Sequence, residues 1–193
     1  MKAVLAAVTA AGSGLLGASL ASRPGSRRFH VLTASVAATW LAGAKATGPV
    51  SRGRRDIAQP VAAGVGAFAA FYGCALVARR IPPLRRAITG VLDHAHRGPT
   101  ASVAATTLAT GAAEEVFFRG TLYGALGPAG STAAYVLSTT ATRNPALVLA
   151  SAAMGTLFAW QRGRSGGVQA PLLTHVVWSA LMLRFMPRLF PPD

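Results

Sequence analysis

The chain has little negative charge and almost no cysteine. Its 193 residues include five Asp or Glu, 19 Lys or Arg and a single cysteine, Cys74. One cysteine excludes an intrachain disulfide and any multi-cysteine metal site. Charged residues make up only 12% of the chain and hydrophobic residues 52%, whereas soluble domains carry about 25% charged residues. The composition therefore favours a membrane protein, and the length favours one compact unit.

The excess of basic residues raises the question of a nucleic-acid partner. The arginines gather in short clusters at 23–28, 52–55 and 79–86, between apolar stretches. A basic helix or an aromatic-interleaved motif, which an RNA or DNA binder needs, does not occur. Clusters that flank apolar segments are typical of helix anchoring at anionic membrane lipids. We therefore expect membrane lipids as partners and no nucleic acid.

The apolar residues fall into seven segments. A spanning helix needs about 20 residues, so the first, third, fourth and seventh are long enough, while the fifth and sixth are tilted or packed inside. This pattern predicts an all-α fold: a polytopic transmembrane helical bundle, multi-pass in the cell membrane. Residues 1–98 would form N-terminal transmembrane helices with basic linkers, and 99–187 a core bundle that carries the site. The segments are 3–22, 30–46, 57–78, 99–125, 131–142, 146–161 and 168–187.

Two points about insertion stay open on sequence grounds. The first segment resembles a signal peptide with a cleavage site at Ser19-Leu20-Ala21, although the later apolar segments favour a retained helix. The uncharged linker 126–130 predicts an outside position, which places the arginine-rich stretch 79–97 inside. The basic linkers 23–28 and 45–55 flank one segment and cannot both be inside if it spans.

Two of the five acidic residues stand side by side in the apolar stretch TGAAEEVFFRG, 110–120. A charged side chain at the membrane centre costs about 2.5–3.5 kcal/mol. On a helix Glu115 and Arg119 share a face and can neutralise each other. Glu114 is rotated about 100° away and is free to act as a general base. The alternative is that both glutamates pair with Arg119 and only lock helices together.

A second polar site lies in the last apolar segment. His175 and Ser179 are four residues apart and share a helical face among Leu, Val and Trp178. Intramembrane ionisable residues are functional candidates, although a histidine in a bundle also serves as a simple hydrogen-bonded packing residue. We expect Glu114, Arg119 and His175 to face a common cavity. A carboxylate that activates water, with an imidazole that holds an oxyanion, is a hydrolytic arrangement.

These residues carry a family resemblance. Glu114-Glu115-Val-Phe-Phe-Arg119 resembles the EExxxR motif of the CPBP intramembrane proteases, the CAAX-protease and bacteriocin-processing group, and 155–179 resembles the family's later histidine helix. The likeness covers about residues 100–187. It implies a membrane endopeptidase in which Glu114 activates water, Arg119 partners Glu115 and His175 is the last-motif histidine. The implied substrate is a membrane-anchored protein or peptide.

The sequence departs from the family pattern in two motifs. Tyr135 and Thr139 stand where the middle FxxxH motif would place Phe and His, and Ser179 replaces the usual Asn. A zinc site normally takes three or more protein ligands. Glu114 and His175 are the candidate ligands and supply two, and Glu115 would add a third only by leaving Arg119. A metalloprotease-like site with a divalent metal such as zinc therefore stays an open interpretation, with the absent middle histidine against it. The Thr139 hydroxyl remains a candidate oxyanion donor.

Other histidines do not fill the gap. The stretch Asp93-His94-Ala95-His96 lies in a polar, arginine-flanked linker, and we expect a solvated turn there. Two functions remain open: an intramembrane endopeptidase with a divergent site, or a non-catalytic relative that binds a membrane peptide or acts as an immunity factor. A proton-coupled transporter is less favoured, because the sequence has no inverted repeat.

Overall fold

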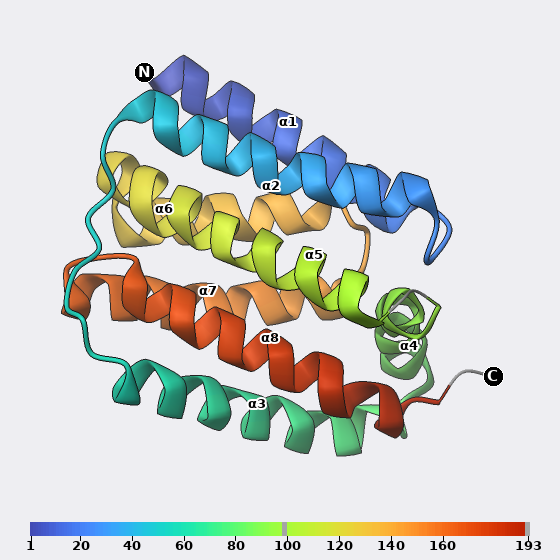
Figure 1. Cartoon of the computed structure of the whole chain (residues 1–193). Helices are drawn as coiled ribbons and strands as arrows, with labels where there is room; N and C mark the ends of the chain where they lie inside the picture. Colours follow the sequence, from blue (N-terminus) through green and yellow to red (C-terminus); the bar gives the residue numbers. More distant parts are fainter. Residues whose placement is uncertain (98–99, 192–193) are drawn as a thin grey trace.

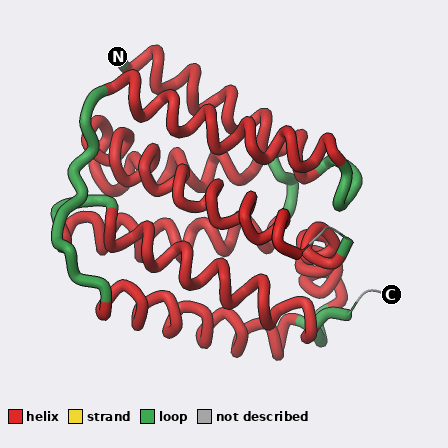
Figure 2. The backbone as a smooth tube through the Cα atoms, viewed as in Figure 1, coloured by secondary structure: helices red, strands yellow, loops and turns green. Residues whose placement is uncertain are grey.

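The computed structural model describes residues 1–97 and 100–191, and every regular element in them is helical (Figure 2). This confirms the predicted all-α fold class; the proposed domain boundary at 98–99 lies outside the described residues. The elements are α1 (Lys2–Leu20), α2 (Arg27–Thr47), α3 (Ala58–Ala78), α4 (Pro82–His96), α5 (Thr100–Glu114), η1 (Glu115–Leu122), α6 (Tyr123–Thr140), α7 (Pro145–Ser165) and α8 (Gln169–Leu189).

The long helices lie side by side along a bundle, and α4 lies across one end of it (Figure 1). Helix α5 continues into η1, so the described chain passes along the bundle once for each predicted apolar segment. Among the residues that the structure describes, only α1 and α3 are both long and apolar enough to cross a membrane, with mean hydropathies of 1.7 and 1.9. The other passes carry polar side chains along their length. The predicted multi-pass insertion therefore stays a proposal.

Local sequence signals set several helix ends. The Ser26 side chain accepts the Phe29 amide and caps α2, and Asn144 accepts the amides of Ala146 and Leu147 at the start of α7. The next residue, Pro145, opens α7, and proline suits a first turn because its missing N–H has no helical partner there. Gly127 has φ of 71° and breaks α6, so the uncharged linker 126–130 turns the chain at the end opposite α4 (Figure 1).

An aromatic core fixes η1 against the N-terminal hairpin. Trp40 of α2 is fully buried and stacks on Phe117, at 4.9 Å between ring centroids, and meets Phe118 edge-on at 5.0 Å. Gly12 of α1 leaves room for the Trp40 ring, which a Cβ at that position would overlap. Interior packing of this density transmits any change in volume. The two glutamates before Phe117 are therefore held by a rigid neighbour.

Candidate active site

The glutamate–arginine motif sits in an unusually wide helical segment. Residues Glu115–Leu122 form a π-helix, and the amide of Tyr123 donates to the carbonyls of Phe118 and Gly120 at its end. Sequence reasoning predicted an ordinary α-helix here and missed the wider turn. Widened turns inside α-helices are rare and often coincide with functional sites. The widening begins between Glu114 and Glu115, so the two carboxylates belong to different helical segments.

Glu115 is completely buried and has two charged or polar partners. Its Oε1 accepts the Nδ1–H of His175 at 2.9 Å, and its Oε2 lies 3.5 Å from Arg119 Nε. Sequence reasoning paired Glu115 with Arg119 but did not place His175 on it. A buried carboxylate needs such partners, because leaving a buried charge unpaired costs several kcal/mol.

Arg119 is also completely buried and contacts several neighbours besides Glu115. Its Nη2 donates to the carbonyl of Gly155 at 3.2 Å, and its guanidinium lies over the ring of Tyr135 at 4.3 Å. The absence of a side chain at Gly155 permits this approach, since a Cβ there would lie 3.2 Å from Nη2. The expectation that Arg119 faces a common cavity with Glu114 was wrong: the arginine lies behind the cavity wall.

His175 is oriented by three neighbours. Besides its bond to Glu115, its ring stacks on Phe158 at 4.8 Å, and its Nε2 edge faces Gly111, where a Cβ would lie 3.1 Å away. A carboxylate on one ring nitrogen fixes the tautomer and leaves the other nitrogen for chemistry. With Nδ1–H donated to Glu115, Nε2 is the nitrogen available to a ligand.

Glu114 has a different environment from Glu115. It is half-buried, and its Oε2 accepts the hydroxyl of Tyr135 at 3.1 Å. Sequence reasoning noted Tyr135 only as a substitute for phenylalanine and gave it no role. The signal was present, since a tyrosine keeps the ring and adds a hydroxyl that needs a partner when buried. Tyr135 thus contacts Glu114 with its hydroxyl and Arg119 with its ring.

A cavity of about 290 Å³ opens in front of Glu114. Of the predicted site residues, Glu114, Thr139, His175 and Ser179 line it, whereas Glu115 and Arg119 do not. The rest of the lining is mainly apolar, with Phe29, Met154 and Trp178 among the larger side chains. Small-molecule and peptide sites have this character, an apolar recess with a few converging polar groups.

Thr139 and Ser179, which replace the family's His and Asn, both line the cavity, but the Thr139 hydroxyl already has a hydrogen-bond partner. Its hydroxyl donates to the carbonyl of Tyr135, one turn back on α6, at 3.0 Å. The hydroxyl has one hydrogen to give, so the predicted oxyanion role requires that bond to break. Ser179 is buried on α8, one turn after His175.

The expected solvated turn at 93–96 was wrong. These residues end helix α4, and His94 is only 8% exposed. Its Nε2 lies 3.2 Å from the carbonyl of Ser22, and its ring contacts Phe29 at 4.7 Å. His94 also lines the cavity, in a part formed with the α1–α2 hairpin. Spacing along the chain gave no sign of this, because the contact spans 72 residues.

The donor set does not fit a metal of the zinc type. Within residues 1–97 and 100–191, no three His, Cys, Asp or Glu side chains lie close enough to hold a cation together. The proposed candidates Glu114 and His175 are each engaged elsewhere, with Tyr135 and Glu115. Structural and catalytic zinc sites take at least three protein ligands, so we derive no step through a metal.

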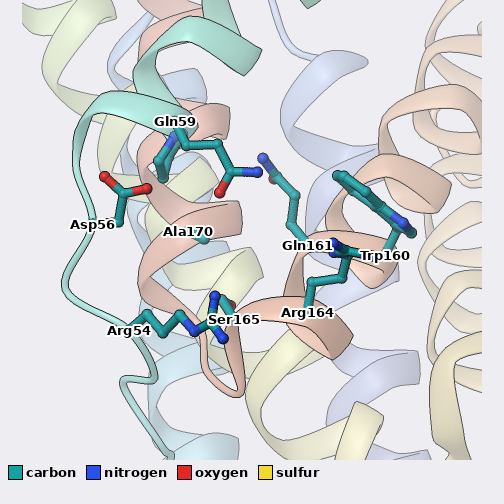
Figure 3. Close-up of a pocket in the computed structure, with 9 residues that line it drawn as sticks. Arg54, Asp56, Gln59, Trp160, Gln161, Arg164, Ser165 and Ala170 are labelled. Atoms are coloured by element: carbon teal, nitrogen blue, oxygen red, sulfur yellow. The ribbon is translucent and has the colours of Figure 1, made fainter.

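A second, smaller recess of about 170 Å³ lies at the bundle end opposite α4. Figure 3 shows Gln59 and Gln161 pointing toward each other across it, with Arg54 beside Ser165. It contains none of the motif residues. A hydrogen bond connects this recess to the candidate active site. The Gln161 side-chain amide donates to the hydroxyl of Thr174, the neighbour of His175, at 2.8 Å. The larger cavity therefore remains the candidate active site.

One of three comparisons with known proteins found a match. Residues 96–181 match the model of the family described as type II CAAX prenyl endopeptidase Rce1-like. The match covers 86 of the 193 residues and supports a likeness to the CPBP/CAAX-protease family over that stretch. The matched stretch includes both glutamates, Arg119, Tyr135 and His175, and the family consists of membrane-embedded endopeptidases. Neither the curated proteins nor the solved structures gave a match.

Proposed function

We propose that the chain is an intramembrane endopeptidase in which Glu114 activates water against a peptide bond of a membrane-associated substrate. The proposal is supported by the different contacts of the two adjacent glutamates. Glu115 pairs with Arg119 and His175, whereas Glu114 lines the cavity and has one hydrogen bond. A general base has to reach the proton it removes, directly or through one water.

The proposed step runs as a hydrolysis. Glu114 takes a proton from a water in the cavity while the water oxygen bonds to the scissile carbonyl carbon. The resulting oxyanion accepts a hydrogen bond from His175 Nε2–H. The carbon–nitrogen bond then breaks, and Glu114 returns the proton to the leaving amine, which gives one carboxylic acid and one amine. Donors aimed at the oxyanion are commonly the largest single contribution to such catalysis.

The proposed step needs an N–H on both ring nitrogens of His175, and an imidazolium has both. One of them donates to Glu115 at 2.9 Å, and in the proposed step the other donates to the oxyanion.

The test is cleavage of a library of membrane-anchored peptides by the purified chain in lipid, beside Glu114→Gln and His175→Ala. We expect the parent to cut and both variants to lose at least about 100-fold in kcat/KM, the usual range for a lost general base. Full cleavage by Glu114→Gln would contradict the proposal. Products identified by mass give the bond that is cut.

A second function is favoured by one observation, the engaged hydroxyl of Thr139 at the position of the family's middle histidine. In that case the cavity holds a membrane peptide without cutting it, as a binding or immunity factor. The two functions separate on one variant, Thr139→His. A silent parent whose Thr139→His variant cuts would establish a binding protein on a protease scaffold, whereas a parent that cuts would rule the binding role out as the main one.

A further inference from the structure

The two ends of the bundle differ in charge. The end that carries α4 has eleven Lys or Arg, in the α1–α2 turn, the stretch 79–97, Arg143 and the end of α8. The opposite end has seven, at the start of α1, the end of α2, the stretch 52–55 and the end of α7. Each end has one described acidic residue, Asp93 or Asp56. Arg119 is in the core.

Helix α4 and the turn before it carry part of this positive charge. Its inner face packs on the bundle, where Ile88 and Leu92 join a cluster with Ala75, Met186 and Phe190. Its outer face and the turn before it form an open recess lined by Arg79, Arg80, Arg85, Arg86, Thr89 and Asp93. We call this the α4 recess. It follows directly on α3, one of the two helices apolar enough to span a membrane.

We propose that the α4 recess binds the phosphate groups of anionic phospholipids and that the α4 end faces the cytoplasmic leaflet. This rests on the membrane embedding of the proposed function. Three observations support it. The recess has four arginines and one aspartate, and its amphipathic helix lies across the bundle end (Figure 1). That end also has more Lys and Arg residues than the opposite end. Arginine matches phosphate geometry, and basic loops concentrate on the cytoplasmic side.

The recess also adjoins the candidate active site through the same helix. Val91, Leu92 and His94 of α4 line the cavity that contains Glu114 and His175. Asn144, at the α6–α7 turn, donates to the carbonyl of Ala87 at 2.7 Å and fastens α4 from the side. A lipid bound at the outer face of α4 therefore contacts the same helix that forms part of the cavity wall.

The first experiment measures lipid binding to the full chain in a neutral detergent. Short-chain phosphatidylglycerol or phosphatidylcholine is titrated and counted by native mass spectrometry. The variant Arg79→Ala/Arg80→Ala/Arg86→Ala is compared with the matched control Arg52→Ala/Arg54→Ala/Arg55→Ala, whose side chains are likewise exposed. We expect the α4 variant to lose on the order of 100-fold in affinity for phosphatidylglycerol, about fivefold for each arginine near an anionic group, and the control to change less than twofold.

Three results would overturn the proposal: equal losses in both variants, no loss in either, or inorganic phosphate that displaces the lipid at equal concentration. The last identifies a soluble phosphate ligand instead of a membrane surface. Binding is measured without substrate, so a failure here leaves the proposed peptidase untouched. Cleavage by the α4 variant in neutral detergent, at the parental rate, shows that the loss is one of lipid binding.

A second experiment tests the orientation. In a Cys74→Ser background, Thr89→Cys marks the α4 recess and Ser51→Cys marks the opposite end. An impermeant maleimide added to right-side-out vesicles should label Ser51→Cys and leave Thr89→Cys unlabelled until the vesicles are opened. The reverse pattern, or labelling of both from outside, overturns the orientation.

Discussion

The two adjacent glutamates occupy two different regions of the molecule. Glu115 lies in a closed polar core with Arg119 and His175, and each of these residues is 5% exposed or less. Glu114 lies one residue earlier, at the cavity, with a single tyrosine hydroxyl for a partner. The same residue type thus lies once in a closed polar core, paired with charged and polar side chains, and once at the wall of a cavity.

The largest effect is expected from breaking the closed core. Glu115→Ala leaves the Arg119 guanidinium buried without its carboxylate, and removing one partner of a buried pair costs about 3–5 kcal/mol. We expect a large loss of unfolding free energy, measured by denaturant titration in mild detergent. The double variant Glu115→Met/Arg119→Met is the control, because an apolar pair of similar volume restores much of the stability. A stable Glu115→Ala chain would contradict the structural role.

The next effect concerns the other glutamate. Glu114→Gln keeps the shape and removes the base, so kcat should fall by about 10²–10⁴-fold. The unfolding free energy should change by less than about 1.5 kcal/mol, since only one hydrogen bond is altered. Both quantities are measured on the same preparation. A variant that unfolds like Glu115→Ala would show that the two glutamates share one structural role.

A smaller effect tests the orientation of the imidazole. Gly111→Ala places a methyl group 3.1 Å from His175 Nε2, closer than ordinary contact. The ring has to tilt away from the cavity while its bond to Glu115 persists. We expect kcat to fall by about tenfold with KM little changed, because misplacing a reacting group affects the chemical step. The control is Gly66→Ala, which meets open space. Equal effects in both variants would exclude a specific contact.

The sequence predicted the helical class, the positions of the helices that run along the bundle and the pairing of Glu115 with Arg119, but it predicted a polar linker where α4 lies. These depend on local composition and on spacing within one helix, which a sequence displays directly. It did not predict the π-helical turn, because nothing in the residue types marks an extra residue per turn. The bond between Glu115 and His175 spans 60 residues, and the placement of His94 in the cavity wall depends on how α4 crosses the bundle. Both follow from tertiary packing that pattern reasoning does not reach.

Tyr135 is tested by variants that separate its hydroxyl from its ring. Tyr135→Phe removes the hydroxyl that holds Glu114 and keeps the ring over Arg119. A hydrogen bond to a charged group contributes about 1.5–3 kcal/mol to stability, so we expect the unfolding free energy to fall by no more than that and kcat/KM to fall by about tenfold. Tyr135→Leu, which also removes the ring from Arg119, should destabilise the fold further. If the two variants are equally stable, the ring has no part in holding the arginine.

The smallest effect is expected at Thr139. Its hydroxyl donates to the carbonyl of Tyr135 within α6 and has no hydrogen left for an oxyanion. Thr139→Val keeps the shape and removes that hydroxyl, so kcat should stay within about threefold of the parent while Glu114→Gln loses activity. The measurement is a cleavage assay at saturating substrate on both variants. A drop of 100-fold or more in Thr139→Val would place the hydroxyl in the reaction, because removing one oxyanion donor costs on that order. Such a drop would also place the reaction nearer to α6 than to Glu114. The different surroundings of the two glutamates would then concern only the structure of the site.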